Sequence, residues 1–178
     1  FTYNKGMLTQ AGLSMPTDDW TWSDFKDYVS KLTVSNPDGS LAQVGAAMNV
    51  TISPMYVPFY LGFGGKWCDT VNKKINLTTD ENVLKGVVEL VDVLQKKHIY
   101  PTSAGIEFGG DYGTAFANIN PDNVSTTAAF WQLDSFAYLA TRAAQYEKTG
   151  VDWDVIAFPL FDSPASPCGS FGYGVFSY

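Results

Sequence analysis

Helix-like and strand-like segments alternate along this chain, and the alternation limits the folds open to it. The clearest helix begins at Asp80 and runs to about residue 97, because apolar residues follow at a 3.6-residue period. A second helix is predicted over 21–32, where Thr21 and Asp24 have the spacing of a capping box. Residues 44–50 (VGAAMNV) and 124–130 (VSTTAAF) are typical of buried strands. The order predicts a single α/β lobe with a mixed, mostly parallel sheet flanked by helices.

The remaining elements are shorter. We expect the apolar residues of the 80–97 helix to serve packing alone, as scaffold. Proline, glycine and turn residues mark the other boundaries. The predicted elements are a strand end and short helix up to Gly12, a helix over 54–65, a hairpin with Asn72 and Lys73 at its tip, a short helix within 109–123, a helix from about 135 to 147, a strand ended by Pro159 and a glycine-rich exit strand over 168–174.

Composition narrows the function classes. Only 16% of the 178 residues are charged and 15% are aromatic, which suits contact with neutral polar surfaces such as sugars. A tyrosine-rich secreted protein without any ligand has the same composition. The net charge of −7 and the lack of a basic cluster argue against nucleic acid. The chain opens with Phe1 inside a strand pattern, so we expect a mature product or an excised fragment of a longer protein.

Motifs for catalysis, metals and cofactors are missing from the sequence. HExxH, CxxC, GxSxG, GxGxxG and P-loop patterns do not occur, so we expect neither a cofactor nor a metal, and no enzyme. The single histidine, His98, follows the long helix, where a capping or surface role is favoured. Cys68 and Cys168 leave a disulfide and two free thiols both open. An acid/base pair among the carboxylates also stays open as an alternative, and its candidates are Asp111, Asp134, Asp152 and Asp154.

Binding is the function that the strand ends favour. In open α/β sheets, ligands lie beyond the carboxyl ends of the strands. Three segments carry polar and aromatic residues there: 48–56 (MNVTISPMY), 128–136 (AAFWQLDSF) and 168–174 (CGSFGYG). Trp131 offers a stacking face, and Gln132 and Asp134 offer hydrogen bonds to hydroxyls. The alternatives are that Trp131 belongs to the core and that Asp134 caps the following helix.

The order of several motifs resembles the extracellular solute-binding proteins of ABC sugar importers, the maltose-binding-protein-like group. These motifs are TYNKGMLTQAGL, WTWSDFKDYVSKLT, GFGGKW, DENVLKGVVELVDVLQKKHIYP, TAFANINPDNVSTTAAF and WDVIAFPLF followed by CGSFGYGVF. The resemblance implies a fold of two α/β lobes with the ligand between them. It implies that residues 1–178 form one ligand-binding lobe, the second, of a larger two-lobe protein.

The resemblance also implies which residues contact the ligand. Tyr56 and Trp131 would stack on a sugar, and Asn49, Gln132 and Asp134 would bind its hydroxyls. The full predicted set is Asn49, Ser53, Met55, Tyr56, Trp131, Gln132, Asp134, Ser170 and Phe171. Ile52 and Pro54 align where maltose-binding protein supplies a carboxylate and an aromatic residue, which argues against a maltodextrin ligand.

The function implied is binding of an extracellular oligosaccharide for delivery to an ABC transporter permease. The implied partners are the sugar, the first lobe of the same protein and the permease. We expect a monomer that is periplasmic or a cell-surface lipoprotein in a bacterium. The alternatives are a fragment of a carbohydrate-active enzyme and the same fold serving a non-sugar solute.

Overall fold

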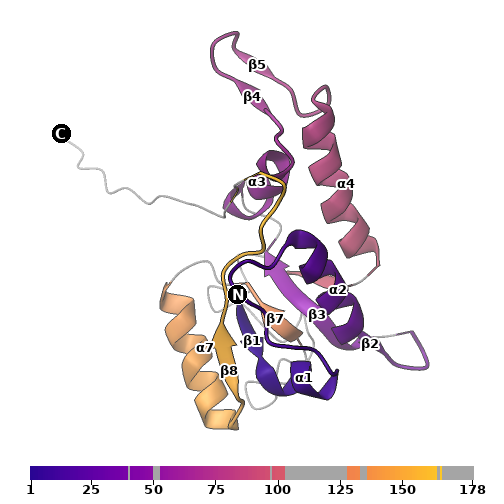
Figure 1. Ribbon diagram of the computed structural model, residues 1–178, viewed down its shortest axis with the longest axis vertical. Coiled ribbons are helices and arrows are strands. Elements are labelled where there is room, and N and C mark those ends of the chain that lie inside the picture. The colour runs from indigo at the N-terminus through magenta and orange to yellow at the C-terminus, as the bar shows by residue number, and fades with distance from the viewer. Residues whose placement is uncertain are drawn as a thin grey trace, which may run out of the picture.

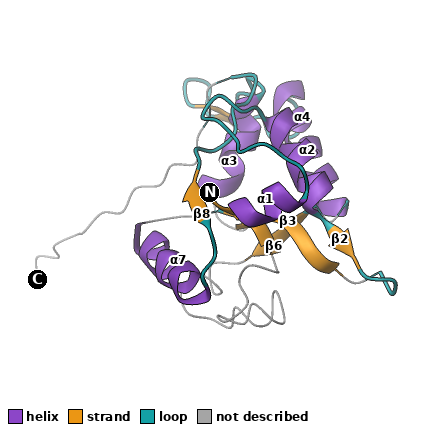
Figure 2. Cartoon of the chain, turned by 60° about the horizontal axis from the view of Figure 1, so that its bottom comes forward, coloured by secondary structure: helices purple, strands orange, loops and turns teal. Residues whose placement is uncertain are grey.

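A mixed β-sheet with helices on both faces forms the centre of the computed structural model (Figures 1 and 2). The structure describes residues 1–39, 41–49, 53–96, 98–102, 128–132, 136–163 and 165. Helices α1 to α4 lie over one face of the sheet, and α7 lies over the other (Figure 2). The predicted class, an α/β lobe with a mixed sheet, is confirmed.

The sheet has its parallel strands in the middle. Strands β6 and β7 both run parallel to β3, on opposite sides of it, while β1 and β2 run antiparallel to their neighbours. The strand order is β2-β3-β7-β1-β8, with β6 beside the carboxyl half of β3. The strand bounds are Thr2–Asn4 (β1), Val34–Ser35 (β2), Leu41–Asn49 (β3), Ile99–Thr102 (β6), Ala128–Trp131 (β7) and Trp153–Val155 (β8).

The helices begin where the sequence predicts. Thr21 Oγ1 accepts the Asp24 backbone N–H at 3.2 Å and the Asp24 carboxylate accepts the Thr21 N–H at 2.8 Å, so the predicted capping box is confirmed. The Thr21 hydroxyl, which donates to the Asp24 carboxylate at 2.7 Å, lowers the pKa of Asp24, and the Thr21 backbone N–H lowers it further. The Asp80 carboxylate accepts the N–H groups of Asn82 and Val83, which caps α4. The helix bounds are Lys5–Gln10 (α1), Trp22–Leu32 (α2), Ser53–Gly62 (α3), Glu81–Gln95 (α4) and Phe136–Thr149 (α7).

The structure also tests some of the predictions for smaller elements. The hairpin is confirmed as β4 (Cys68–Asp69) and β5 (Lys74–Ile75), with Lys73 at a positive φ of 52°, and it projects from the body of the lobe (Figure 1). Cys68 is exposed, and Cys168 lies outside the described residues. The expectations for 109–123, 124–127 and 168–174 also lie outside them. No helix among the described residues is long and apolar enough to cross a membrane.

The apolar residues of α4, which we expected to serve packing alone, are packed only in part. Val83 and Val93 are fully buried, but Leu84, Val88 and Val91 are 40%, 65% and 41% exposed. The apolar residues therefore cover more of the helix circumference than the lobe can bury. The 3.6-residue period alone does not show which of them face a neighbour.

An aromatic cluster forms the larger core, between the sheet and α2. Phe130 of β7 is fully buried, with ring centroids 5.4 Å from Trp20 and 5.9 Å from Phe25. Gly45 lets α2 approach the sheet, because a Cβ there would lie 2.3 Å from the Val29 carbonyl oxygen. The close approach explains why β3 consists mainly of small residues.

A smaller core lies between the opposite face of the sheet and α7. Val44, Ala47, Ala128, Trp131 and Tyr146 form it. The Tyr146 ring stacks on Trp153 at 5.4 Å between centroids. The sheet is thus packed on both faces, which accounts for the unbroken apolar run of β7.

His98 joins α4 to the sheet. The backbone N–H of His98 donates to the Val93 carbonyl at 3.1 Å, and the backbone carbonyl of His98 accepts the Ala46 N–H at 3.2 Å. Burial lowers the pKa of the imidazole from its ordinary value of 6.5, and Lys96 lowers that pKa further, while Asp92 raises it. Because the fold disfavours the protonated form, the unfolded chain takes up a proton at a higher pH than the folded chain does.

We expect the free energy of unfolding to fall as the pH drops from 7.5 to 5.5, and His98→Gln to reduce this loss. Urea unfolding of both chains at the two pH values measures the difference. The Phe1 amino group, whose pKa burial lowers to about 6, destabilises the fold in the same direction but is common to both chains. An equal loss of stability in the two chains would contradict the role of His98.

Candidate ligand-binding site

Three parallel strands end at one edge of the sheet. Asn49 at the end of β3 pairs with Thr102 at the end of β6, and Ala47 pairs with Trp131 at the end of β7. The antiparallel strand β1 reaches the same edge with its amino end, because Thr2 pairs with Trp131. The described strand ends of the predicted binding segments 48–56 and 128–136 therefore meet at this carboxyl edge.

Gln132 is held at the carboxyl edge by its backbone. Its N–H donates to the Ala47 carbonyl at 2.9 Å, which continues the hydrogen bonding of β7 to β3 by one residue. The side chain is only 4% exposed. A buried amide at a strand end is positioned to read hydroxyl groups of a ligand that reaches it, because it combines a donor and an acceptor.

Trp131 lies in the smaller core. Its side chain is 4% exposed and packs in the cluster with Val44 and Tyr146, on the α7 face of the sheet. This burial fits the packing alternative that the sequence left open. A stacking role for Trp131 stays a prediction.

Tyr56 lies in the first turn of α3, the helix that follows β3 after the carboxyl edge. The residue is half-buried, and its ring centroid is 5.5 Å from that of Tyr60 one turn later. Burial raises the pKa of Tyr60, and Tyr56 adds to the effect. The two rings form an aromatic pair on the helix that begins beside the edge.

The other predicted site residues are placed less completely. Asn49 ends β3, and Ser53 and Met55 belong to the first turn of α3, but only their backbones are described. Asp134, Ser170 and Phe171 lie outside the described residues. The structure brings the strand ends of the predicted set together and leaves the roles of their side chains as predictions.

The sequence did not single out two further residues, Tyr60 on α3 and Thr102 at the carboxyl edge. Tyr60 follows Tyr56 at the i, i+4 spacing that places two side chains on one helix face, a signal present in the sequence. Thr102 ends β6, a strand not predicted because its four residues include Pro101. Its position beside Asn49 depends on strand pairing, and no local sequence signal predicts it.

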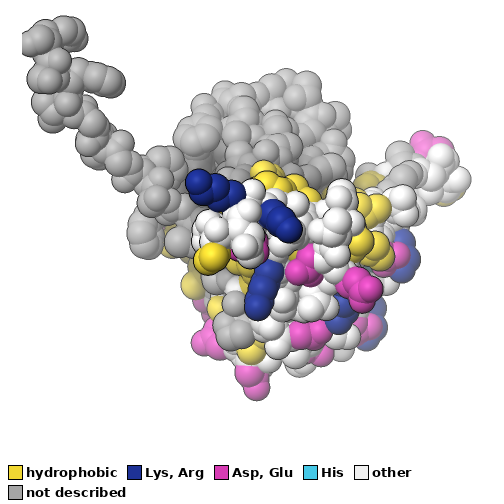
Figure 3. All heavy atoms as spheres, turned by 90° about the horizontal axis from the view of Figure 1, so that it is seen from above, with side chains coloured by type: hydrophobic (Ala, Val, Ile, Leu, Met, Phe, Trp, Pro, Cys, Tyr) yellow, Lys and Arg dark blue, Asp and Glu magenta, His cyan; other side chains and the backbone are white. Residues whose placement is uncertain are grey.

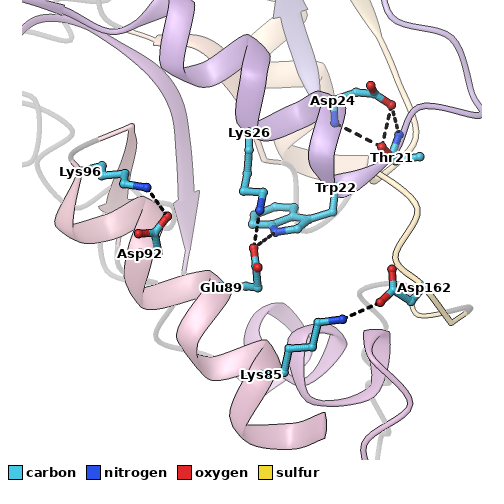
Figure 4. Close-up of polar contacts among 9 residues, drawn as sticks. All are labelled: Thr21, Trp22, Asp24, Lys26, Lys85, Glu89, Asp92, Lys96 and Asp162. Carbon is cyan, nitrogen blue, oxygen red and sulfur yellow. Dashed lines mark hydrogen bonds and ion pairs between the residues drawn. The ribbon is translucent and has the colours of Figure 1, made fainter.

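A pocket of about 350 Å³ lies away from this edge, between α2, α4 and residues 160–162. Glu89 accepts the Trp22 indole N–H at 3.1 Å and the Lys26 ammonium at 2.6 Å, and Lys85 pairs with Asp162 at 2.8 Å (Figure 4). The charged side chains that line the pocket are thus already paired with one another. A ligand there would compete with these ion pairs for the charged groups, so the carboxyl edge is the better candidate.

The described carboxylates give no support to an acid/base site. Asp152 forms an ion pair with Lys5 at 2.7 Å, and Asp154 lies on β8 opposite Tyr3. Asp111 and Asp134 lie outside the described residues. In the part of the chain that the structure describes, no three His, Cys, Asp or Glu side chains gather as they would around a metal ion.

This architecture defines a class of protein. A mixed sheet flanked by helices, with three parallel strands that end at one edge, is one lobe of the two-lobe periplasmic-binding-protein fold. The chain belongs to the family of bacterial extracellular solute-binding proteins, whose model matches residues 1–178. The resemblance found in the sequence is thereby confirmed. Among curated proteins, none matches the sequence.

Solved structures with the same fold include several sugar-binding proteins. A sugar transporter from Rhizobium etli in an open conformation is 19% identical, with a TM-score of 0.59, over 92% of this chain and 38% of its own. An ABC substrate-binding protein from Listeria monocytogenes in complex with cycloalternan is 18% identical, with a TM-score of 0.59, over 91% and 37%. A maltose/maltodextrin-binding domain from Bdellovibrio bacteriovorus bound to maltotriose is 21% identical, with a TM-score of 0.57, over 90% and 36%. The chain thus spans well under half the length of these proteins.

Proposed function

We propose that this lobe forms one wall of a binding site for a neutral carbohydrate, which the whole protein delivers to an ABC transporter permease. The observation that carries the proposal is the convergence of β3, β6 and β7 on one edge, where Asn49 and Gln132 stand at strand ends and Tyr56 lies in the first turn of α3. Amide groups and aromatic rings are the groups that match the hydroxyls and apolar faces of a sugar.

Two further observations support a neutral ligand. The charged fraction of 16% is low, and the carboxyl edge ends in amide, hydroxyl and aromatic residues. Proteins of the same fold bind cycloalternan, maltotriose and tagatose. Neutral sugars share the same chemistry of hydroxyls on an apolar frame.

The proposal extends to the partners and the location. A second lobe of the same protein would supply the opposite wall, and closure of the two lobes would bury the sugar and present a surface to the permease. The protein would act outside the cytoplasmic membrane, in the periplasm or as a surface lipoprotein. One wall alone makes about half the contacts, so we expect the 178-residue chain to bind weakly.

Substitution of Tyr56 tests the site. We expect Tyr56→Ala to weaken sugar binding roughly three- to tenfold, because an aromatic contact contributes about 0.5–1.5 kcal/mol. Tyr56→Phe keeps the ring and should retain most of the affinity. NMR titration of the chain with cycloalternan and tagatose at millimolar concentration measures the change.

The control is Leu61→Ala, which lies on another face of α3 and is 39% exposed, so it should leave the affinity unchanged. Equal affinity for the Tyr56→Ala and unmodified chains would remove Tyr56 from the site. Binding of a peptide or polyamine in place of every sugar would overturn the carbohydrate assignment. Turnover of the sugar would favour an enzyme.

A further inference from the structure

Helix α4 carries an exposed apolar stripe. Leu84, Val88 and Val91 follow the i, i+4, i+7 spacing of one helix face and are 40%, 65% and 41% exposed. The opposite face already packs against the lobe, since Gly86 touches α3 and Val93 is 1% exposed. Internal packing therefore accounts for one face of α4 and leaves the stripe at the surface.

Charged residues border the stripe on one flank only. At about 100° per residue, Glu81, Lys85, Asp92 and Lys96 lie within roughly 80° of Val88 on the same side, and Glu89 lies on that side at about 100°. Glu89 already binds Lys26 and the Trp22 indole N–H within the lobe, and the other four residues alternate in sign along the helix. Each acidic residue has a basic counterpart at the same distance on the other side of the helix middle. Glu81 corresponds in this way to Lys96, and Asp92 corresponds to Lys85. Acidic and basic side chains also lie interspersed on the surface seen in Figure 3.

We propose that α4 pairs with α4 of a second copy of this chain, antiparallel and about a two-fold axis. The stripes of the two copies would cover each other, and Lys85 of each would meet Asp92 of the other, with Glu81 and Lys96 paired in the same way. A parallel pair would instead place residues of like sign at the same level. The charge pattern therefore favours α4 of a second copy as the partner, in the antiparallel orientation.

The existing ion pairs do not oppose this arrangement. Lys85 pairs with Asp162 at 2.8 Å and Lys96 with Asp92 at 2.7 Å, and the side chains in both pairs are largely exposed. Exposed pairs contribute little, so exchanging them costs little. One helix of 15 residues is about 22 Å long and buries less than a standard interface of roughly 1,600 Å². The dimer is consequently weak, and the chain is the expected monomer at low concentration.

Sedimentation velocity of the 178-residue chain over a wide concentration range tests the proposal. The expected result is a monomer that dimerises as concentration rises, more readily at low salt. Val88→Glu should abolish dimerisation, because it buries unpaired charges in the stripe. The matched control is Val71→Glu, a residue 87% exposed in the β4–β5 hairpin, which should leave dimerisation unchanged.

Charge reversal tests the direction of pairing. Lys85→Glu and Asp92→Lys should each weaken dimerisation roughly three- to tenfold, because each converts two attractive pairs into repulsive ones. An equimolar mixture of the two variants restores opposite charges across the interface and should form heterodimers. Lys31→Glu on α2 is the control for the change in net charge. Circular dichroism of every variant verifies the fold.

A chain that stays monomeric at every concentration would overturn the proposal. Dimers that survive both Val88→Glu and the single charge reversals would overturn it too, because they would use another surface. Failure of the mixture to recover would exclude the antiparallel direction. None of these outcomes bears on solute binding, which depends on the carboxyl edge.

Discussion

Replacing Phe130 with alanine is expected to lower the free energy of unfolding by about 3–5 kcal/mol, the usual cost of removing a buried phenylalanine side chain. Phe130 is fully buried, and its ring centroid lies 5.4 Å from Trp20 and 5.8 Å from Tyr3. The loss includes both the transfer of the ring from water and the cavity left among neighbours that are themselves fixed by other rings. It is a large fraction of the roughly 5–15 kcal/mol that stabilises a domain.

Urea unfolding followed by tryptophan fluorescence measures this loss. Phe130→Leu retains most of the volume and is expected to cost less than about 1.5 kcal/mol. Leu160→Ala, at a residue 50% exposed, is a control expected to change stability by about 0.5 kcal/mol or less. A loss below about 1 kcal/mol for Phe130→Ala would show that this core relaxes around the cavity.

Replacing Gly86 with alanine is expected to destabilise the fold by about 2–3 kcal/mol, although alanine favours a helix by about 1 kcal/mol over glycine. A Cβ at residue 86 would lie 1.8 Å from the Phe59 carbonyl oxygen. That oxygen belongs to the backbone of α3 and cannot rotate away as a side chain does. The two helices would have to separate, which would disturb the packing around Phe59, a fully buried residue of α3.

The matched control for Gly86→Ala is Asn82→Ala, an exposed residue in the first turn of α4. It introduces the same alanine without the contact to α3 and is expected to change stability by less than about 0.5 kcal/mol. Thermal unfolding of both variants compares them under one condition. Equal stability of the two variants would mean that α3 and α4 are not held at the distance seen here.

The helices were the most predictable part of the fold, because their signals are local. Thr21 and Asp24 lie three residues apart and form the capping box whatever the rest of the chain does. Asp80 ends the preceding turn and caps α4 by the same kind of contact. The positive φ of Gly12 and of Lys73 likewise follows from local turn geometry.

The strands were less predictable, because pairing depends on residues far apart in the chain. Strand β6 contains Pro101 and was missed, yet it pairs with β3 more than fifty residues earlier. Strand β8 is only three residues long, although the apolar run around it predicted more. A short strand exists only where a neighbour supplies its hydrogen bonds.

The candidate site was also predicted from the sequence only in part. The rule that ligands lie at the carboxyl ends of strands selects the edge where Asn49 and Trp131 both stand, and ligand binding at that edge stays a prediction. The sequence did not distinguish a tryptophan at the edge from a tryptophan packed under α7. Trp131 is 4% exposed because Tyr146, fifteen residues further on, covers that face of the sheet.

Local sequence signals were sufficient to predict the class of fold, the limits of α2 and α4, and which segments have strand ends at the carboxyl edge. Caps, turns and periodicity act within a few residues, so they can be read in order along the chain. Packing between distant segments determines the strand order, the burial of Trp131 and the exposure of Val88, so these features could not be predicted from the sequence. Those features depend on which surfaces meet, and a helix with apolar residues around most of its circumference does not itself specify the face that its neighbours will cover.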